Sequence, residues 1–238
     1  MQLASADHIY SCFCIRSEGG QGTAFLFGKR RKCFFVTARH VLAGAVAGGN
    51  ILLRKDNEWQ PHPLTMVKHH SEGQDVSVFS VAGIDVDVRH KFSHKNDPKI
   101  FAGQELKFTG FPHGLENTVT NPLGFSTPLV RTAFLSGAIL DSATDNTLLV
   151  LDGLNNPGYS GGPVWAPGPR LDAPTLLGVI SGYRVELKSK SGVFRDIGDG
   201  AEEKIDKMFV KPNSGMIHAV PFSDLAKLVS GVSVFNTP

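Results

Sequence analysis

The sequence predicts an all-β fold made of two antiparallel barrels or sandwiches with about six strands each. Periodicity typical of helices is nearly absent before the carboxyl-terminal end of the chain. Short runs that alternate in polarity or are rich in β-branched residues are separated by turn-forming clusters, and the 238 residues include 26 Gly and 14 Pro. These runs fall into two groups, and each group is large enough to close a barrel or to form a sandwich.

The first group of expected strands lies in the amino-terminal part of the chain, where Gly, Pro, Asn and Asp punctuate the apolar runs. The expected strands are Tyr10–Ile15, Gly22–Phe27, Cys33–Thr37, Ile51–Arg54, Leu64–Val67 and Asp75–Val81. The basic run Lys29–Lys32 falls between the second and third of them. It predicts a solvated hairpin tip, with a nucleic-acid contact as the alternative.

The second group of expected strands follows at similar spacing and ends in the one segment that reads as a helix. The expected strands are Leu106–Gly110, Val130–Leu140, Thr147–Leu151, Ser160–Trp165, Leu176–Ser181 and Met216–Val220. The helix is expected over Phe222–Leu228, directly after Pro221. Ser223 is the candidate residue for its amino-terminal cap.

Two polar segments organise the chain around these groups. Phe92–Ala102 is polar and prone to turns, so we expect the two halves to join there, with residues 1–95 in the first and 96–238 in the second. Val185–Pro212 carries most of the late charge and is long for a loop in a compact domain. We expect it to be a mobile flap that belongs to neither barrel.

Composition narrows the classes of function. Lys and Arg number 24 and Asp and Glu number 22, for a net charge of +2, which is too near neutral to predict a nucleic-acid partner. No run approaches the ~18 consecutive apolar residues that a membrane-spanning helix needs. The start of the chain also lacks the pattern of a secretory signal. We therefore expect a cytoplasmic protein without a membrane or nucleic-acid partner.

The cysteines fit a reducing compartment, because an odd count of three is too small for a disulfide framework. Cys12 and Cys14 share one face of an expected strand, and Cys33 lies on another. We interpret all three as buried thiols, with a disulfide or a metal site as the alternative.

The strongest chemical signal is the turn Gly158-Tyr159-Ser160-Gly161-Gly162-Pro163. A serine between glycines on a tight turn exposes its hydroxyl and lets backbone N–H groups face one point. An acyl-transfer nucleophile needs this arrangement, because donors set in place must meet the developing oxyanion. A simple Gly/Ser turn between strands is the alternative.

A serine hydroxyl needs a base, and an imidazole base needs a carboxylate that orients it. His40 follows the apolar strand Cys33–Thr37, and Asp75 opens the strand Asp75–Val81, so these residues and Ser160 supply all three groups. His70 is a rival base because it is close to Asp75 in the chain, but it lacks the position at a strand end. His69 and His70 would point to opposite faces of a strand, so they are poorly placed to share a metal.

Six segments carry a resemblance to a known family, in the same order along the chain. They are Gly22-Thr23-Ala24-Phe25-Leu26, Thr37-Ala38-Arg39-His40, Asp75-Val76-Ser77-Val78, Phe108-Thr109-Gly110-Phe111-Pro112, Gly158-Tyr159-Ser160-Gly161-Gly162-Pro163 and Gly178-Val179-Ile180-Ser181. Through them the chain resembles the trypsin-like serine peptidases of the chymotrypsin fold over nearly its whole length. The resemblance implies two antiparallel six-stranded β-barrels of chymotrypsin type with the catalytic cleft between them. It also implies an oxyanion hole formed by the N–H groups of Gly158 and Ser160.

The departures from the family pattern point to its intracellular or bacterial branch, which includes the heat-shock-type peptidases. Members that are activated by cleavage place an Asp before the nucleophile to receive a new amino terminus. Tyr159 stands there in this chain, and no Ile-Val-Gly-Gly start is present. Val41 replaces the cysteine that follows the histidine in secreted members. We therefore expect an enzyme that needs no proteolytic activation.

The resemblance also implies a substrate pocket. Leu154, six residues before the nucleophile, would form its floor, and Ser181 and Tyr183 would line its wall. An apolar floor cannot stabilise a desolvated Lys or Arg head group. We expect cleavage after small or medium apolar residues, with an acidic pocket built by Asp152 as the alternative.

The sequence therefore predicts a serine endopeptidase that cleaves a protein or peptide substrate through an acyl-enzyme, with His40, Asp75 and Ser160 as its triad. No metal or organic cofactor is expected. The alternative from another class is a catalytically silent binding module, a pseudoprotease that keeps the barrels. An esterase would use the same mechanism on another substrate. Control by a regulatory protein partner, by loop ordering or by expression stays open.

Overall fold

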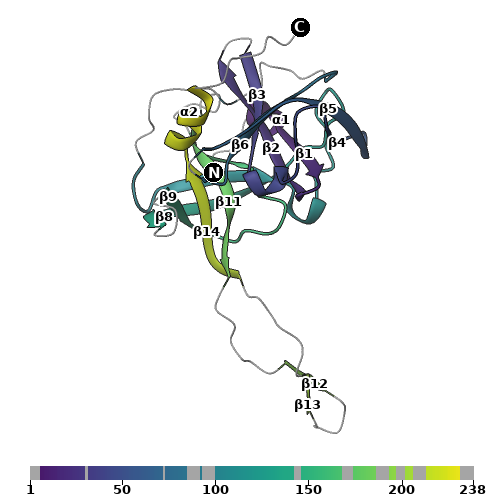
Figure 1. The fold of residues 1–238 in the computed structure, drawn as a ribbon. Coiled ribbons are helices and arrows are strands. Elements are labelled where there is room, and N and C mark those ends of the chain that lie inside the picture. The colour runs from purple at the N-terminus through teal and green to yellow at the C-terminus, as the bar shows by residue number, and fades with distance from the viewer. Residues whose placement is uncertain are drawn as a thin grey trace.

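Two closed six-stranded antiparallel barrels form the body of the molecule (Figure 1). The computed structural model describes residues 6–29, 32–71, 73–84, 92, 100–141, 146–167, 174–185, 193–196, 202–205 and 213–230. The all-β class and the two barrels of chymotrypsin type that the sequence predicts are confirmed. The expected boundary between residues 95 and 96 lies outside the described residues and stays a prediction.

The first barrel closes in the strand order β1-β2-β3-β6-β5-β4. Its strands are β1 (Cys12–Ser17), β2 (Gly20–Lys29), β3 (Lys32–Thr37), β4 (Asn50–Lys55), β5 (Glu58–His69) and β6 (Ser77–Val81). Its interior is aromatic: the rings of Phe35 and Phe79 stack at 5.0 Å, and Phe13 meets Phe35 edge-on at 5.2 Å. Such pairs stabilise a core beyond the area that they bury. The pairing of Lys29 with Lys32 confirms a hairpin at the basic run.

The second barrel closes in the order β10-β11-β14-β9-β8-β7. Its strands are β7 (Glu105–Gly110), β8 (Leu129–Asp141), β9 (Asn146–Asp152), β10 (Pro163–Ala166), β11 (Thr175–Val185) and β14 (Asn213–Pro221). Alternate residues of these strands point inwards and form a separate apolar core that includes Leu106, Leu151 and Ile217. Ser160 lies in the turn directly before β10.

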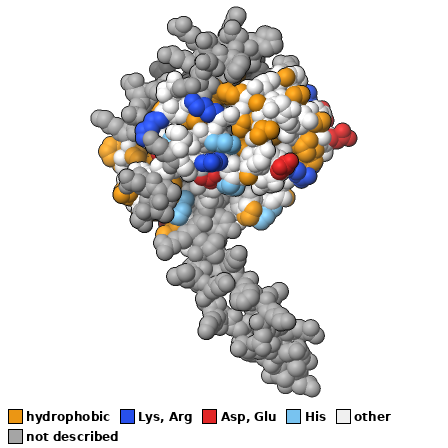
Figure 2. Space-filling view, in the orientation of Figure 1, with side chains coloured by type: hydrophobic (Ala, Val, Ile, Leu, Met, Phe, Trp, Pro, Cys, Tyr) orange, Lys and Arg blue, Asp and Glu red, His pale blue; other side chains and the backbone are white. Residues whose placement is uncertain are grey.

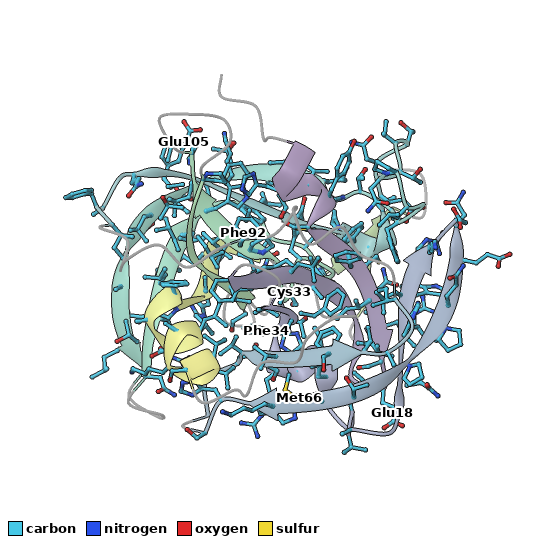
Figure 3. All side chains as sticks on the ribbon, turned by 90° about the horizontal axis from the view of Figure 1, so that it is seen from above. Glu18, Cys33, Phe34, Met66, Phe92 and Glu105 are labelled. Carbon is cyan, nitrogen blue, oxygen red and sulfur yellow. The ribbon has the colours of Figure 1, made fainter. Side chains whose placement is uncertain are left out.

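A third apolar core joins the barrels. It combines residues of the first barrel, such as Phe27 and Phe34, with Phe222 and Leu225 of the helix α2 (Phe222–Ser230). Phe92 and Phe34 lie in the middle of the molecule when it is seen from above, whereas Glu18 and Glu105 point outwards at its edge (Figure 3). Helix α2 thus packs across both barrels, because its buried face is part of the core that they share.

The structure corrects several expected boundaries. Tyr10 ends a short helix, α1 (Ala6–Tyr10), which the sequence analysis missed, and the first strand begins only at Cys12. Asp75 lies before β6 and Ser160 before β10, so each sits in a turn rather than on a strand. Ser223 is the second residue of α2 and not the residue that precedes it. Strand limits follow the pairing of backbone groups, which local composition alone does not specify.

Part of the segment Val185–Pro212 is regular. The strands β12 (Val193–Asp196) and β13 (Glu202–Ile205) pair with each other in a two-stranded sheet and with neither barrel (Figure 1). The expectation that the segment belongs to neither barrel is therefore confirmed for these strands, whereas its description as a loop is wrong for them. Val185 ends β11 and therefore belongs to the second barrel. The remaining residues of the segment lie outside the described ones, and their mobility stays a prediction.

The described surface carries mixed charges. On the face shown in Figure 2, basic side chains lie among acidic, histidine and hydrophobic ones rather than in one patch. Neither helix within the described ranges is long and apolar enough to cross a membrane. The cysteines Cys12, Cys14 and Cys33 are buried and none of them forms a disulfide, which confirms their interpretation as buried thiols. Burial raises the pKa of Cys12 and of Cys14 to about 12, so both remain protonated and unreactive at neutral pH.

Candidate active site

His40 projects from a turn that the first barrel anchors. Strand β3 ends at Thr37, and Arg39–Leu42 form a single turn of 3-10 helix. Val41 and Leu42 of this turn are buried in the core, whereas the side chain of His40 remains 50% exposed. The two apolar residues therefore fix the turn and leave the imidazole in reach of a ligand.

Asp75 binds His40 at two points. Its Oδ1 accepts the backbone N–H of His40 at 2.9 Å, and its Oδ2 lies 2.8 Å from the ring Nδ1. The hydrogen bond that His40 donates to Asp75 raises the pKa of His40 and outweighs partial burial, which acts in the opposite direction. A neutral ring that donates its Nδ1–H to Asp75 keeps the lone pair of Nε2 free to accept a proton. This is the arrangement that a general base needs.

Ser160 lies in a turn that is bonded to both barrels. Its carbonyl accepts the N–H of Thr23 from the first barrel at 2.8 Å. The N–H of the next residue, Gly161, donates to Ile180 of the second barrel at 2.7 Å, and Gly162 N–H closes the turn onto Tyr159 at 2.8 Å. The backbone of the turn is therefore fixed between β2 and β11, and Ser160 is half-buried.

Gly161 brings this turn close to the His40 turn. It has a φ of +85°, and a Cβ there would stand 2.2 Å from the Thr23 carbonyl oxygen and 2.7 Å from the backbone nitrogen of Ala38. The segment after Ser160 thus lies against the residue two before His40. Within the described residues no hydrogen bond joins Ser160 Oγ to the His40 ring. Such contacts are often long without substrate and shorten when the substrate binds.

The N–H groups of Gly158 and Ser160 face away from the bonds that hold the turn. The Pro157 carbonyl accepts His113 N–H at 2.7 Å, and the Tyr159 carbonyl accepts Gly162 N–H at 2.8 Å. Because the carbonyl and the N–H of a trans peptide point in opposite directions, the N–H groups that follow these two carbonyls point to the other side. Neither N–H group has a backbone acceptor among the described residues.

Two further residues stabilise this loop. Thr23 donates its hydroxyl to the Gly158 carbonyl at 2.7 Å and accepts Phe111 N–H at 3.3 Å. The Tyr159 ring is buried in the second core, where it meets Phe108 edge-on at 4.9 Å, and burial raises the pKa of its phenol. Tyr159 thus occupies the position that holds an Asp in family members activated by cleavage, and its ring makes an apolar contact there.

The expected pocket residues lie on two neighbouring segments. Ser181 is half-buried on β11, and Tyr183 follows on the same strand, although its side chain lies outside the described residues. Leu154 is 56% exposed, and its carbonyl accepts Nη1 of Arg131 at 2.8 Å. Arg131 could not be found from the sequence, because only the fold brings this residue of β8 to the Leu154 carbonyl. Asp152 is exposed on β9.

An open cavity of about 400 Å³ lies beside the imidazole and is lined by Arg39, His40, Ala43, Gly44, His69, Gly73 and Asp75. His69 and His70 follow each other on the chain. His69 Nδ1 hydrogen-bonds the Ser77 hydroxyl at 2.6 Å, and the side chain of His70 is buried. Asp75 meets the ring of His40. No group of three or more metal-ligating side chains occurs in the described part of the chain.

Comparisons with known proteins agree with this fold. The model of a trypsin-like peptidase domain matches residues 22–171. Among solved structures, an inactive form of the protease Rv3671c is 17% identical with a TM-score of 0.60, and the match covers 96% of this chain and 91% of that one. A mutant of Rv3671c from M. tuberculosis is 16% identical with a TM-score of 0.59, at 94% and 87% coverage.

The HtrA-type protease AlgW, solved with a tripeptide, is 17% identical with a TM-score of 0.60. The match covers 94% of this chain but only 60% of that chain. At these identities the solved structures establish a shared fold. A search of curated proteins finds no match.

Proposed function

Because the chain belongs to the trypsin-like peptidase family, we propose that it is a serine endopeptidase that hydrolyses peptide bonds of a protein substrate through an acyl-enzyme. Ser160 is its nucleophile, His40 its base and Asp75 the carboxylate that orients the base. The observation that carries the proposal is the double contact of Asp75 with His40, at 2.9 Å to the backbone N–H and 2.8 Å to Nδ1. This contact fixes both the position of the ring and its tautomer.

The chemistry follows the serine-triad template of this family. The Ser160 oxygen attacks the substrate carbonyl while His40 Nε2 accepts the hydroxyl proton. The oxyanion that forms accepts hydrogen bonds from the N–H groups of Gly158 and Ser160. His40 then returns the proton to the leaving amine, and the acyl-enzyme remains. A water molecule, deprotonated by the same imidazole, hydrolyses the ester and restores Ser160.

Tyr159 supports activity without proteolytic activation. Its ring packs against Phe108 in the core of the second barrel, and both carbonyls that orient the two N–H groups already have their donors. The loop therefore needs no ion pair with a new amino terminus to take this form. We expect the intact chain to be active.

The direct test is labelling by a fluorophosphonate probe, which reacts with an activated serine and leaves a covalent adduct. Wild-type protein should be labelled at Ser160, and Ser160→Ala should not be labelled. Ser11→Ala is a matched control, because Ser11 is buried and its hydroxyl donates to the His8 carbonyl. A folded wild-type chain that stays unlabelled would contradict the proposal and favour a silent binding module. Labelling together with cleavage of esters but not of proteins would favour an esterase.

A further inference from the structure

We propose that Gln74 and Asp224 are a positioning pair, in which helix α2 holds the loop that carries Asp75 and thereby sets the contact between Asp75 and His40. This inference rests on the proposed function, because it assigns the pair to the same catalytic site. Neither residue touches the reacting atoms. They act through Asp75, the neighbour of Gln74 in the chain.

Gln74 reaches from the first barrel to the second. Its side chain is 2% exposed, and its Nε2 donates to the Thr147 carbonyl at 2.9 Å and to Asp224 Oδ2 at 2.7 Å. Both partners are acceptors only, so the amide nitrogen must face them and the orientation of the side chain is determined. A hydrogen bond to a buried carboxylate is among the stronger ones in proteins.

Asp224 is itself held in place. It lies in the first turn of α2, is 6% exposed, and its second oxygen accepts Lys227 Nζ at 2.9 Å. A carboxylate in a first helical turn is also favoured by the helix dipole. The helix beneath it is anchored by Leu225 and Leu228, which pack in the same core as Val76 and Val78 of the first barrel. Asp224 is therefore a rigid support for Gln74.

The residues on both sides of Asp75 are thus fixed, whereas the side chain of Asp75 is 28% exposed. On one side Gln74 is bonded to Asp224, and on the other Val76 is fully buried with its N–H bonded to the Gln74 carbonyl at 2.8 Å. The carboxylate itself relies on these neighbours for its position. If Gln74 is released, the whole turn can shift away from His40. A misplacement of about 1 Å costs up to about 10²-fold in rate.

The first test uses Gln74→Met, which keeps the length and the neutral charge of the side chain but removes both donors. In an otherwise wild-type chain we expect kcat to fall about 10-fold with KM nearly unchanged, because the substrate-binding surface is untouched. In a Ser160→Ala background, NMR titration of the His40 ring should show a lower pKa, because the hydrogen bond that the ring donates to Asp75 is what raises it. The NMR measurement needs no activity.

Lys68→Met is the matched control. Lys68 Nζ donates to the Leu228 carbonyl at 3.4 Å, so it also ties the first barrel to α2, but it lies on strand β5 and not on the loop that carries Asp75. Its removal should lower stability and leave the His40 titration in place. Removal of the Lys68 cation cannot lower the pKa of His40. A His40 pKa that falls in Gln74→Met but not in Lys68→Met therefore reports the contact with Asp75. The charged groups that line the cavity beside His40 are Arg39, His69 and Asp75, and neither variant changes them.

A reversed pair gives a second test. Gln74→Glu alone places two carboxylates against each other and should reduce kcat more than Gln74→Met. Adding Asp224→Asn supplies a donor to the new carboxylate and should recover part of the loss. A normal His40 pKa and normal kcat in Gln74→Met, with only a lower melting temperature, would overturn the positioning role. Failure of the proposed function would instead appear as unlabelled wild-type protein, whatever the NMR titration shows.

Discussion

The two halves of the site are held by different kinds of contact. In the first barrel, His40 and Asp75 meet through side-chain bonds at the edge of an open cavity, and the imidazole is half exposed. In the second barrel, the Ser160 turn is fixed by backbone bonds and by Gly161, which packs against the backbone of the first barrel. Changes of charge and pH in the first half should therefore alter activity. Added side-chain volume in the second half should alter stability.

The largest effect should come from removing a member of either half. Ser160→Ala and His40→Ala should each lower kcat by about 10⁶-fold, and the double variant should be little worse, because the triad acts as a unit. Initial rates on a protein substrate, normalised by folded concentration, measure this. Losses that multiply in the double variant would mean that the two halves act independently, and a Ser160→Ala protein with wild-type rates would refute the site.

Asp75→Asn tests the half that depends on charge. It keeps the shape of the side chain but favours the wrong imidazole tautomer, so we expect a loss of about 10⁴-fold, as in the serine-triad template. The pH profile of kcat/KM gives the sign. His40 must be neutral to act as a base, and Asp75 raises its pKa, so the acidic limb of the wild type should lie above ~6.5, the ordinary value of a histidine. In Asp75→Asn that limb should move to lower pH, and an unmoved limb would contradict the assignment.

Gly161→Ala tests the half that depends on volume. At a φ of +85°, with the Thr23 carbonyl oxygen only 2.2 Å from the place that a Cβ would take, a methyl group has no room, and we expect a loss of about 3 kcal/mol or more in the free energy of unfolding. Gly182→Ala is the control for stability, since a Cβ there meets nothing within 4 Å. Denaturant unfolding compares the two. Equal stability in both variants would mean that the turn is not packed as tightly as described.

Most of the candidate site could be proposed from the sequence because its chemistry is local in the chain. His40 follows an apolar strand and Ser160 lies in a glycine-rich turn, and each pattern is complete within a few residues. The placement of Asp75 and Ser160 on strands was wrong, since strand limits depend on which backbone groups find partners. The short helix α1 was missed because five residues are too few to display helical periodicity.

The contacts between distant segments could not be predicted in the same way. Gln74 and Asp224 are 150 residues apart in sequence, and neither residue belongs to a recognisable motif. Each is an ordinary polar residue until the fold buries it beside the other. Arg131 likewise gains its place only when β8 closes the second barrel and brings it to the Leu154 carbonyl. Pairing of this kind is a property of the tertiary structure.

The smallest expected effect concerns the residue that precedes the cleaved bond. We propose a preference for small or medium apolar residues, such as Ala, Val, Leu or Met, over Lys and Arg. Leu154 offers no negative charge, and the guanidinium of Arg131 bonded to its carbonyl at 2.8 Å adds a cation that would repel a basic side chain. We expect a preference of roughly 10- to 200-fold, the range that apolar pockets achieve.

A peptide-library profile tests this preference, with Arg131→Leu as the companion variant. Removal of the cation should relax discrimination against Lys and Arg while leaving the rates on apolar residues nearly unchanged. A wild-type profile dominated by Lys or Arg would refute the apolar pocket and identify Asp152 as the determinant. A profile dominated by Asp or Glu that disappears in Arg131→Leu would show that the cation selects the substrate directly. In either case the pocket of the second barrel would select substrates by charge, whereas the Ser160 turn of the same barrel would remain sensitive to added side-chain volume. The contrast between charge and volume would then lie within one barrel rather than between the two.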